Sequence, residues 1–292
     1  MILYIEPFSG LSGDMFLSGL CELADGFDLV TTLPEKLNLP DGRIEIETLN
    51  KNGIVCKHVK ISDLNSKAAK HHHHHHHGHH HHHHFSDYLK MGFSKIAALF
   101  GREKAVVFSN GHSRGLKEIN EIIDKGNISE GAKRIARDIF HIIGLSESKI
   151  HQMPLETIHF HEVSGVDSIL DIVGCAVMLD RLEIEKTYSE SVCTGYGMVN
   201  TQHGILPVPA PATADILKGI PTYRGEEKGE KVTPTGAAIL KYLKPDFSAP
   251  SVERKQIAYG PGQKDFKYPN VLRLSLVELV KESEKKKPDL KN

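Results

Sequence analysis

The stretch His159-Phe-His-Glu-Val-Ser-Gly-Val-Asp-Ser-Ile-Leu-Asp-Ile-Val-Gly174 predicts a short extended segment followed by an almost wholly apolar helix. Ser164 to Asp167 resembles a capping box, which indicates where this helix begins. Apolar side chains then recur at helical spacing, at Ile169, Ile172, Val173, Ala176 and Leu179. We expect the helix to lie in the core, with Ile158, Phe160 and Val163 of the preceding segment also facing inward.

The same stretch carries side chains suited to metal binding or acid/base chemistry. His159 and His161 are two residues apart, so in an extended segment both point to one side. Asp167 and Asp171 stand at positions i and i+4, on one face of the predicted helix. Two imidazoles at a strand end and two carboxylates on the next helix could converge on a divalent cation. Taken singly, Asp167 also fits a helix cap and either histidine fits a satisfied core residue, but a carboxylate inside an apolar helix needs a partner.

The N-terminus predicts a strand, a glycine-rich loop and a helix. Residues 2–5 are apolar β-formers, Pro7 to Asp14 form the loop, and helical spacing continues to about Leu23. Such a loop can direct backbone N–H groups at an anion, and its candidate binding residues are Ser9, Gly10, Ser12 and Gly13, with Asp14 as an acid/base candidate. A tight turn with an N-cap explains the same residues, and the spacing is neither that of a P-loop nor GxGxxG.

The remaining patterns complete an α/β (α+β) fold with a mixed sheet and packed helices. A hairpin with one solvent face is predicted over residues 43–48 and 54–61, and a kinked strand over 186–199. Helices are predicted over 115–124 and 129–143, the second capped by Ser129 and burying Ile135, Ile139, Ile142 and Ile143. Strands over 252–259 and 271–279 are expected to be joined by a turn at Gly260-Pro-Gly262.

Two later segments hold further binding candidates. Residues 202–215 form an extended, proline-rich approach to a short helix that starts near Pro211 and ends before Gly219. His203 lies in this approach, where a histidine is more often a surface residue than a functional one. Thr233-Pro-Thr-Gly236 predicts another helix start, with Thr233 as N-cap, and Thr233, Thr235 and Gly236 form a second candidate anion site.

A histidine run is the most biased part of the chain. Seven histidines, Gly78 and six more occupy residues 71–84. So many imidazoles cannot pack as a core, and neutral imidazole binds nickel, copper and zinc, so the run predicts metal gathering; an inert loop or a purification tag are the alternatives. The candidate ligands are His71, His72, His73, His74, His75, His76, His77, His79, His80, His81, His82, His83 and His84. An insertion follows over about residues 85–111, with a helix near 88–100.

Composition narrows the class of protein. The 292 residues carry a formal net charge of -1, which argues against nucleic acid or a membrane surface as partner. Four cysteines lack disulfide or zinc-knuckle spacing, and neither a signal peptide nor a membrane span is present, so a cytoplasmic location is predicted. The charged residues 281–292 are predicted to be a disordered tail.

Taken in order, these motifs resemble the LarC family, the nickel-insertion proteins of nickel-pincer nucleotide cofactor biosynthesis. The resemblance covers residues 1–280 as one domain, apart from the insertion at 85–111. It rests on Pro7-Phe-Ser-Gly-Leu-Ser-Gly-Asp-Met-Phe, the histidine run, His159 to Gly174, His203-Gly-Ile-Leu-Pro-Val-Pro-Ala-Pro-Ala-Thr, Thr233-Pro-Thr-Gly-Ala-Ala and Tyr259-Gly-Pro-Gly.

The resemblance implies an activity of the lyase class. Nickel would be inserted into pyridinium-3,5-bisthiocarboxylic acid mononucleotide with CTP and magnesium or manganese, forming one metal–carbon and two metal–sulfur bonds, and the product would serve lactate racemase and related enzymes. With this chemistry, we expect metal to meet substrate at Asp14, His159, His161, Glu162, Asp167 and Asp171. The phosphate-bearing substrate would lie on the two anion sites and His203.

The sequence departs from the family pattern in one respect. Family members commonly continue into a C-terminal domain that carries CTP binding and assembly, and some encode the two halves in overlapping frames. We therefore expect a separately encoded C-terminal partner and a homo-oligomer. The alternatives are a nickel-storage protein or metallochaperone that works through the histidine run, and a metal-dependent phosphohydrolase using Asp14, His159, His161 and Asp171.

Overall fold

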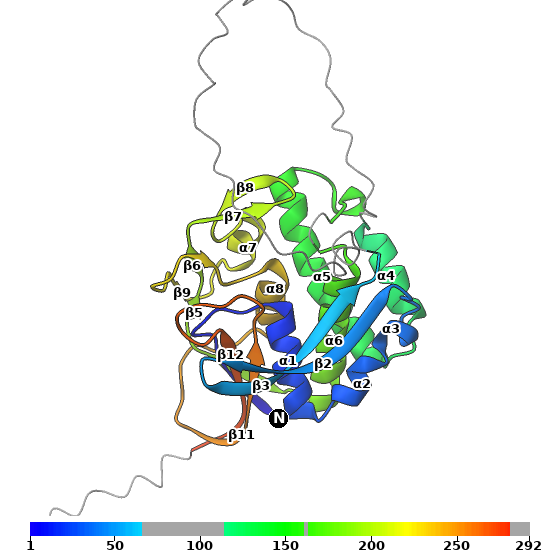
Figure 1. Ribbon diagram of the computed structural model, residues 1–292. Helices are drawn as coiled ribbons and strands as arrows, with labels where there is room; N and C mark the ends of the chain where they lie inside the picture. The colour runs from blue at the N-terminus through cyan, green and yellow to red at the C-terminus, as the bar shows by residue number, and fades with distance from the viewer. Residues whose placement is uncertain (66–113, 161–162, 281–292) are drawn as a thin grey trace, which may run out of the picture. The chain divides into compact units, whose positions relative to one another are not determined.

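The computed structural model describes residues 1–65, 114–160 and 163–280 (Figure 1). The predictions for the histidine run, the 85–111 insertion, His161, Glu162 and the 281–292 tail lie outside the described residues. None of the helices in the described part has the length and apolar character that crossing a membrane requires.

A four-stranded mixed sheet, as predicted, has the strand order β11-β12-β1-β4. Strand β1 (Ile2–Glu6) pairs antiparallel with β12 (Val271–Leu279) and parallel with β4 (Lys186–Ser189). Strand β11 (Val252–Pro261) forms the edge beside β12. The sheet therefore brings the first strand of the chain between two strands from its second half.

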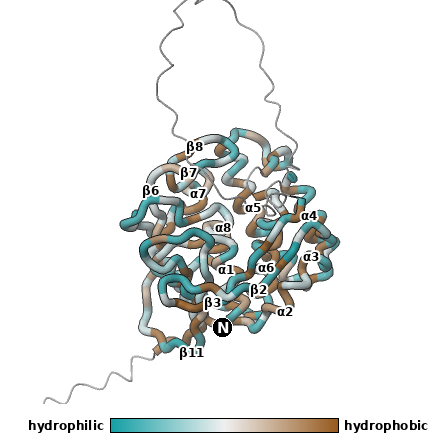
Figure 2. The backbone as a smooth tube through the Cα atoms, in the orientation of Figure 1, coloured by the Kyte–Doolittle hydropathy of each residue, from teal (hydrophilic) through white to brown (hydrophobic). Residues whose placement is uncertain are grey.

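Helices α1 and α6 form the interior. Helix α1 (Gly13–Ala24) contacts both β11 and α6 (Val166–Leu182), and all but one of its residues are buried. The five apolar positions predicted to lead α6 into the core are buried, as are Ile158, Phe160 and Val163, and Figure 2 shows how hydrophobic this helix is. Helix α5 (Glu130–His151) packs on the other side of α6.

Smaller elements surround this interior. The predicted hairpin is confirmed as β2 (Gly42–Lys51) and β3 (Ile54–Asp63), which contacts α1 and β11. The other helices are α2 (Phe27–Thr31), α3 (Leu33–Lys36), α4 (Leu116–Lys125), η2 (Leu155–Thr157), α7 (Pro211–Ile216) and α8 (Pro234–Leu243). Three short pairs are β5 (Val192–Cys193) with β9 (Thr222–Tyr223), β6 (Gly195–Tyr196) with β10 (Gly229–Glu230), and β7 (Met198–Thr201) with β8 (Gly204–Pro207).

Predicted helix starts were mostly right. Ser129 caps α5 by accepting a hydrogen bond from the Ala132 N–H at 3.1 Å, although the helix extends beyond Ile143 to His151. Ile139 and Ile143 are buried, whereas Ile135 and Ile142 are partly buried. The capping-box prediction for α6 was wrong, because the N-cap position is taken by Gly165, which has no side chain to accept a hydrogen bond.

Three strand predictions also need correction. Residues 186–199 form several short strands, because Gly195 and Gly197 adopt positive φ angles of 75° and 106° that break a continuous ladder. The Gly260-Pro-Gly262 segment is no tight turn, since β11 continues to Pro261 and the connection runs over residues 262–270. The segment before α6 makes a single bridge between His159 and Gly115 in place of a strand.

Gly260 allows β11 to lie directly on α1, and this contact gives a stability prediction. A Cβ atom at Gly260 would stand 1.7 Å from the Met15 carbonyl oxygen. We expect Gly260→Ala to lower the free energy of unfolding by about 3 kcal/mol, measured by urea denaturation. In the control Gly219→Ala, the new Cβ meets nothing within 4 Å, so only the positive φ of 82° costs about 1 kcal/mol. Equal losses in both variants would contradict this close packing.

Candidate functional site

The loop between β1 and α1 is held by direct backbone contact with the segment before α8. The Leu11 N–H donates to the Lys231 carbonyl at 2.8 Å, and the Thr233 N–H donates to the Leu11 carbonyl at 3.2 Å. Gly10 has a φ of +94°, and a Cβ there would lie 1.9 Å from the Lys231 oxygen. Only glycine fits at this position, so the loop glycine predicted for anion binding also permits this contact.

The start of α8 lies against the same loop. Thr233 is the N-cap, as predicted, because its hydroxyl accepts from the Gly236 N–H at 3.3 Å. The hydroxyl oxygens of Thr233 and Thr235 are 2.9 Å apart. A Cβ at Gly236 would stand 2.6 Å from the Leu11 carbonyl oxygen. The two stretches that the sequence marked as separate anion sites therefore meet at one place.

Asp14 occupies the first turn of α1. Its Oδ1 atom accepts hydrogen bonds from the Ser12 hydroxyl and, at 3.0 Å, from the Met15 N–H. The positive end of the α1 dipole thus already faces a carboxylate. A further anion at this end would meet that negative charge, so the start of α1 favours a cation over a phosphate.

Asp171 approaches the same turn from α6. A Cβ at Gly13 would lie 2.9 Å from Asp171 Oδ2 and 3.1 Å from the Thr235 hydroxyl, so the glycine makes room for both groups. Asp171 Oδ1 is enclosed and has no hydrogen-bond partner among the described residues. Burial, followed by the charges of Asp14 and Asp167, raises the pKa of Asp171 well above its usual range. This carboxyl therefore keeps its proton to a higher pH than an exposed aspartate.

His58, on β3, completes this group and was missed from the sequence. Its side chain is only 8% exposed, and its Nε2 atom lies 3.8 Å from Asp14 Oδ2. Within the described part of the chain, that nitrogen makes no hydrogen bond. The alternation of β3, which turns Cys56 and His58 inward, was the signal that could have identified it.

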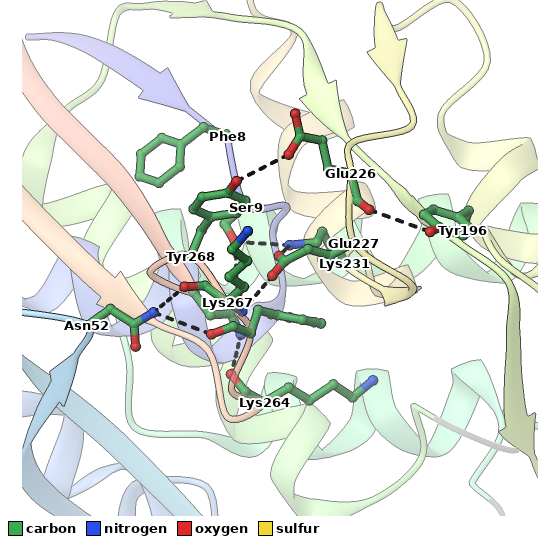
Figure 3. Close-up of polar contacts among 12 residues, drawn as sticks. Phe8, Ser9, Asn52, Tyr196, Glu226, Glu227, Lys231, Lys264, Lys267 and Tyr268 are labelled. Carbon is green, nitrogen blue, oxygen red and sulfur yellow. Dashed lines mark hydrogen bonds and ion pairs between the residues drawn. The ribbon is translucent and has the colours of Figure 1, made fainter.

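Lys231 holds the other end of the loop and was also missed (Figure 3). Its side chain is 4% exposed, and its ammonium group lies 2.8 Å from Glu227 Oε2. The same group is 3.4 Å from the Ser9 hydroxyl and 4.0 Å from the centre of the Phe266 ring. Nothing in the sequence distinguishes this lysine from a surface lysine, because its burial arises from three segments far apart in the chain.

Residues 263–270 close the loop from a third side. Asn270 lies with its Oδ1 atom 3.4 Å from the Ser9 hydroxyl and donates to the Lys264 carbonyl at 2.8 Å. Asn52, at the turn between β2 and β3, donates to the Lys267 carbonyl at 2.7 Å. Ser9 is therefore fixed by contacts with the loop before β12 as well as with Lys231.

Two predicted site residues have their observed contacts elsewhere. His159 is exposed and bridges to Gly115 at the start of α4. His203 lies at the turn between β7 and β8, with its ring centre 4.9 Å from that of His151 at the end of α5. Asp167 is on the first turn of α6 and acts electrostatically on Asp171. As the side chains stand, no three histidine, cysteine, aspartate or glutamate side chains in the described ranges are arranged to hold a metal ion.

The fold and site define a class of protein: a mixed α/β protein in which a glycine-rich loop, two helix starts and a buried histidine surround a pair of aspartates. The family described as nickel insertion protein matches residues 3–291. The chain therefore belongs to the nickel insertion protein family. No solved structure matches it.

Curated relatives carry a more specific name. The chain is 37% identical to the pyridinium-3,5-bisthiocarboxylic acid mononucleotide nickel insertion protein of Thermotoga sp. (strain RQ2), over 93% of the chain and 60% of that relative. It is 37% identical to the protein of the same name from Alkaliphilus metalliredigens, over 94% of the chain and 60% of the relative. It is 35% identical to the protein of the same name from Staphylococcus epidermidis, over 93% of the chain and 58% of the relative. The chain spans about three fifths of the length of these relatives.

The raised pKa of Asp171 predicts how stability depends on pH. An unfolded aspartate titrates near pH 4, roughly. Above that pH the folded protein holds a proton on Asp171 that the unfolded chain has released, so wild-type stability falls as pH rises toward the raised pKa. Asp171→Asn removes this loss. As pH rises above about 4, the free energy of unfolding of the variant should increase relative to that of wild type, measured by urea denaturation.

Asp215→Asn is the matched control with the opposite sign. Hydrogen bonds from Lys149 and Lys218 lower the pKa of Asp215, so its contribution to stability is present above about pH 4 and is lost as pH falls through the lowered pKa. This variant should lose stability relative to wild type as pH rises. Parallel pH curves for wild type and Asp171→Asn would show that Asp171 titrates normally.

Proposed function

We propose that this chain inserts nickel into pyridinium-3,5-bisthiocarboxylic acid mononucleotide to form the nickel-pincer nucleotide cofactor, which serves lactate racemase and related enzymes. The observation that carries the proposal is the family match over residues 3–291, with relatives that are named for this substrate. Nickel is the substrate of this reaction, and the mononucleotide is the molecule that receives it.

The meeting of the loop and the α8 start supports the binding part of the proposal. A mononucleotide carries a phosphate, which needs hydroxyl and N–H donors and a nearby positive charge. Ser9, Thr233 and Thr235 supply hydroxyls, and Lys231 lies 3.4 Å from the Ser9 hydroxyl. We assign the phosphate to the end of the loop that holds Ser9 and Lys231, whereas the Thr235 hydroxyl borders the same space beside Gly13 as Asp171. His203 remains a proposed substrate contact on the sequence argument.

The acidic side of the loop supports the chemical part. When nickel replaces hydrogen on a ring carbon, the electron pair of the C–H bond becomes the Ni–C bond and the hydrogen leaves as a proton. A base must accept that proton. We propose Asp14, whose Oδ2 atom is not engaged by the Ser12 and Met15 hydrogen bonds to Oδ1. His159 and Asp167 remain proposed nickel ligands, and the same proposal for His161 and Glu162 rests on sequence alone.

CTP, the metal that accompanies it and the assembly are further parts of the proposal. We propose that CTP hydrolysis with magnesium or manganese drives a lyase-class insertion. The relatives are longer than the region they share with this chain, so we place CTP binding and homo-oligomer assembly in a further C-terminal portion. We propose a cytoplasmic location, because Cys21, Cys56, Cys175 and Cys193 are free and buried, as is usual in a reducing compartment.

Reconstitution tests this function. The full chain is mixed with nickel chloride, the bisthiocarboxylate mononucleotide, CTP and magnesium or manganese, with and without a C-terminal portion from a relative. We expect nickelated mononucleotide by mass spectrometry when that portion is present. Asp14→Asn should slow insertion by about 100-fold, because the variant lacks the proposed base. Asp215→Asn, at an ion pair on α7, serves as control and should retain the wild-type rate. No product in any mixture would reject the function.

The histidine run gives a second test, which separates insertion from nickel storage. Replacing all thirteen histidines of residues 71–84 by serine should strongly reduce the amount of nickel bound per chain. At saturating nickel, the insertion rate should stay unchanged, because a supply loop is not needed when the metal is in excess. Bound nickel is measured by equilibrium dialysis. If insertion disappears at every nickel concentration in a variant that still folds, the run itself takes part in the reaction.

A further inference from the structure

The side chains of Asp14, His58 and Asp171 meet at the first turn of α1, where Asp171 Oδ2 borders the space beside Gly13. His58 Nε2 and Asp171 Oδ1 are enclosed and make no hydrogen bond to any described residue. Asp14 Oδ2 is directed at His58, at 3.8 Å. A buried polar atom without a partner costs free energy, so two such atoms, on side chains that adjoin the Asp14 turn, call for a further partner.

We propose that Asp14, His58 and Asp171 bind a divalent first-row transition metal ion. The set offers one imidazole nitrogen and two carboxylates from three different elements: α1, β3 and α6. Imidazole suits nickel, zinc and related ions, whereas magnesium is usually bound by oxygen atoms alone. A cation here would also offset the repulsion between Asp14 and Asp171. Among the described residues, no lysine or arginine forms an ion pair with either of these two carboxylates.

The surrounding contacts orient the proposed ligands. Hydrogen bonds from Ser12 and Met15 hold Asp14 by its Oδ1 atom and leave Oδ2 for a metal. The Val59 N–H donates to the Ser18 hydroxyl at 3.0 Å, which fixes the strand bearing His58 against α1. Gly13 keeps a side chain out of the space beside Asp171 and Thr235. The ligands are not yet at metal distance, so binding requires them to rotate toward the ion.

This site differs from the one expected from sequence, which placed the metal at His159, His161 and Asp167. His58 supplies the nitrogen ligand here, and the histidines proposed from the sequence remain separate candidates. The inference rests on the proposed function only for the identity of the metal, nickel. It deepens that function by placing nickel beside Asp14. As nickel passes to the ring carbon, Asp14 Oδ2 is released from the ion and becomes the base that accepts the ring proton.

Nickel binding by matched variants tests the site. The full-length chain is used with the thirteen histidines of the 71–84 run replaced by serine, because that run would otherwise dominate nickel uptake. Nickel chloride is titrated by calorimetry into this parent and into His58→Gln, Asp171→Asn and the control His141→Asn, an exposed residue on α5. We expect one nickel site in the parent, weakened about 10- to 100-fold by the first two changes and unaffected by the control.

Thermal unfolding separates a lost ligand from a lost fold. Asp171→Asn should be at least as stable as the parent without nickel, yet lose the nickel-dependent rise in Tm that the parent shows. If His58→Gln does not fold, the Asp171→Asn result decides the question alone. Equal nickel affinity in the parent and in a folded ligand variant overturns the site, as does a parent that binds no nickel, which would leave only water between the three groups.

Failure of the proposed metal site can be distinguished from failure of the proposed function. Nickel binding that depends on His58, together with no nickelated product in any mixture, would reject the insertion function and keep the site. Normal insertion and unchanged nickel binding by His58→Gln would keep the function and reject the site.

Discussion

The enclosure of α1 is the constraint on which the rest of the structure depends. This helix lies between β11 and α6, and the hairpin of β2 and β3 contacts it from another direction. A helix enclosed in this way must satisfy its polar groups inside the protein. Ser18 does so by accepting from the Val59 N–H, and the first turn does so through Asp14. The site follows from this arrangement, because Asp14 is buried where three other elements meet.

Two kinds of chemistry meet at the glycine-rich loop. At the Ser9 end, Lys231 and the Ser9 hydroxyl provide donors and a positive charge, and the Thr233 and Thr235 hydroxyls adjoin Asp171 beside Gly13. At the other end, Asp14, Asp171 and His58 provide acceptors in an enclosed space. The substrate that we propose, a mononucleotide that receives nickel, would need both environments within its own length. Backbone contacts at Gly10 and Gly236 are close enough to hold the two sides together without intervening side chains.

The ion pair of Lys231 with Glu227 positions the loop and adds little to the free energy of unfolding. A buried pair has a desolvation cost that its attraction offsets only in part. The ammonium group contacts Glu227, the Phe266 ring and Ser9. This one side chain therefore holds three separate segments of the chain together. The position of Ser9 therefore depends on residues more than 200 positions further along the chain.

The sequence by itself determined the local elements and the family. Helical spacing predicted α6 and its buried face, alternation predicted the β2–β3 hairpin, and Thr233 and Ser129 were recognised as caps, because these features depend on neighbours within a few residues. The family resemblance likewise came from ordered motifs. The sequence did not predict how the strands are divided around Gly195 or where β11 ends after Gly260, because glycine permits several backbone conformations at these positions.

Only the tertiary structure decided which polar residues meet. His58 and Lys231 join the loop from positions far away in the chain, and no local pattern encodes that approach. His203 was grouped with the site by motif order, yet its observed ring contact is with His151. The raised pKa of Asp171 likewise depends on burial and on the charges of Asp14 and Asp167. Distance and desolvation set these properties, and both arise only when separate elements pack against one another.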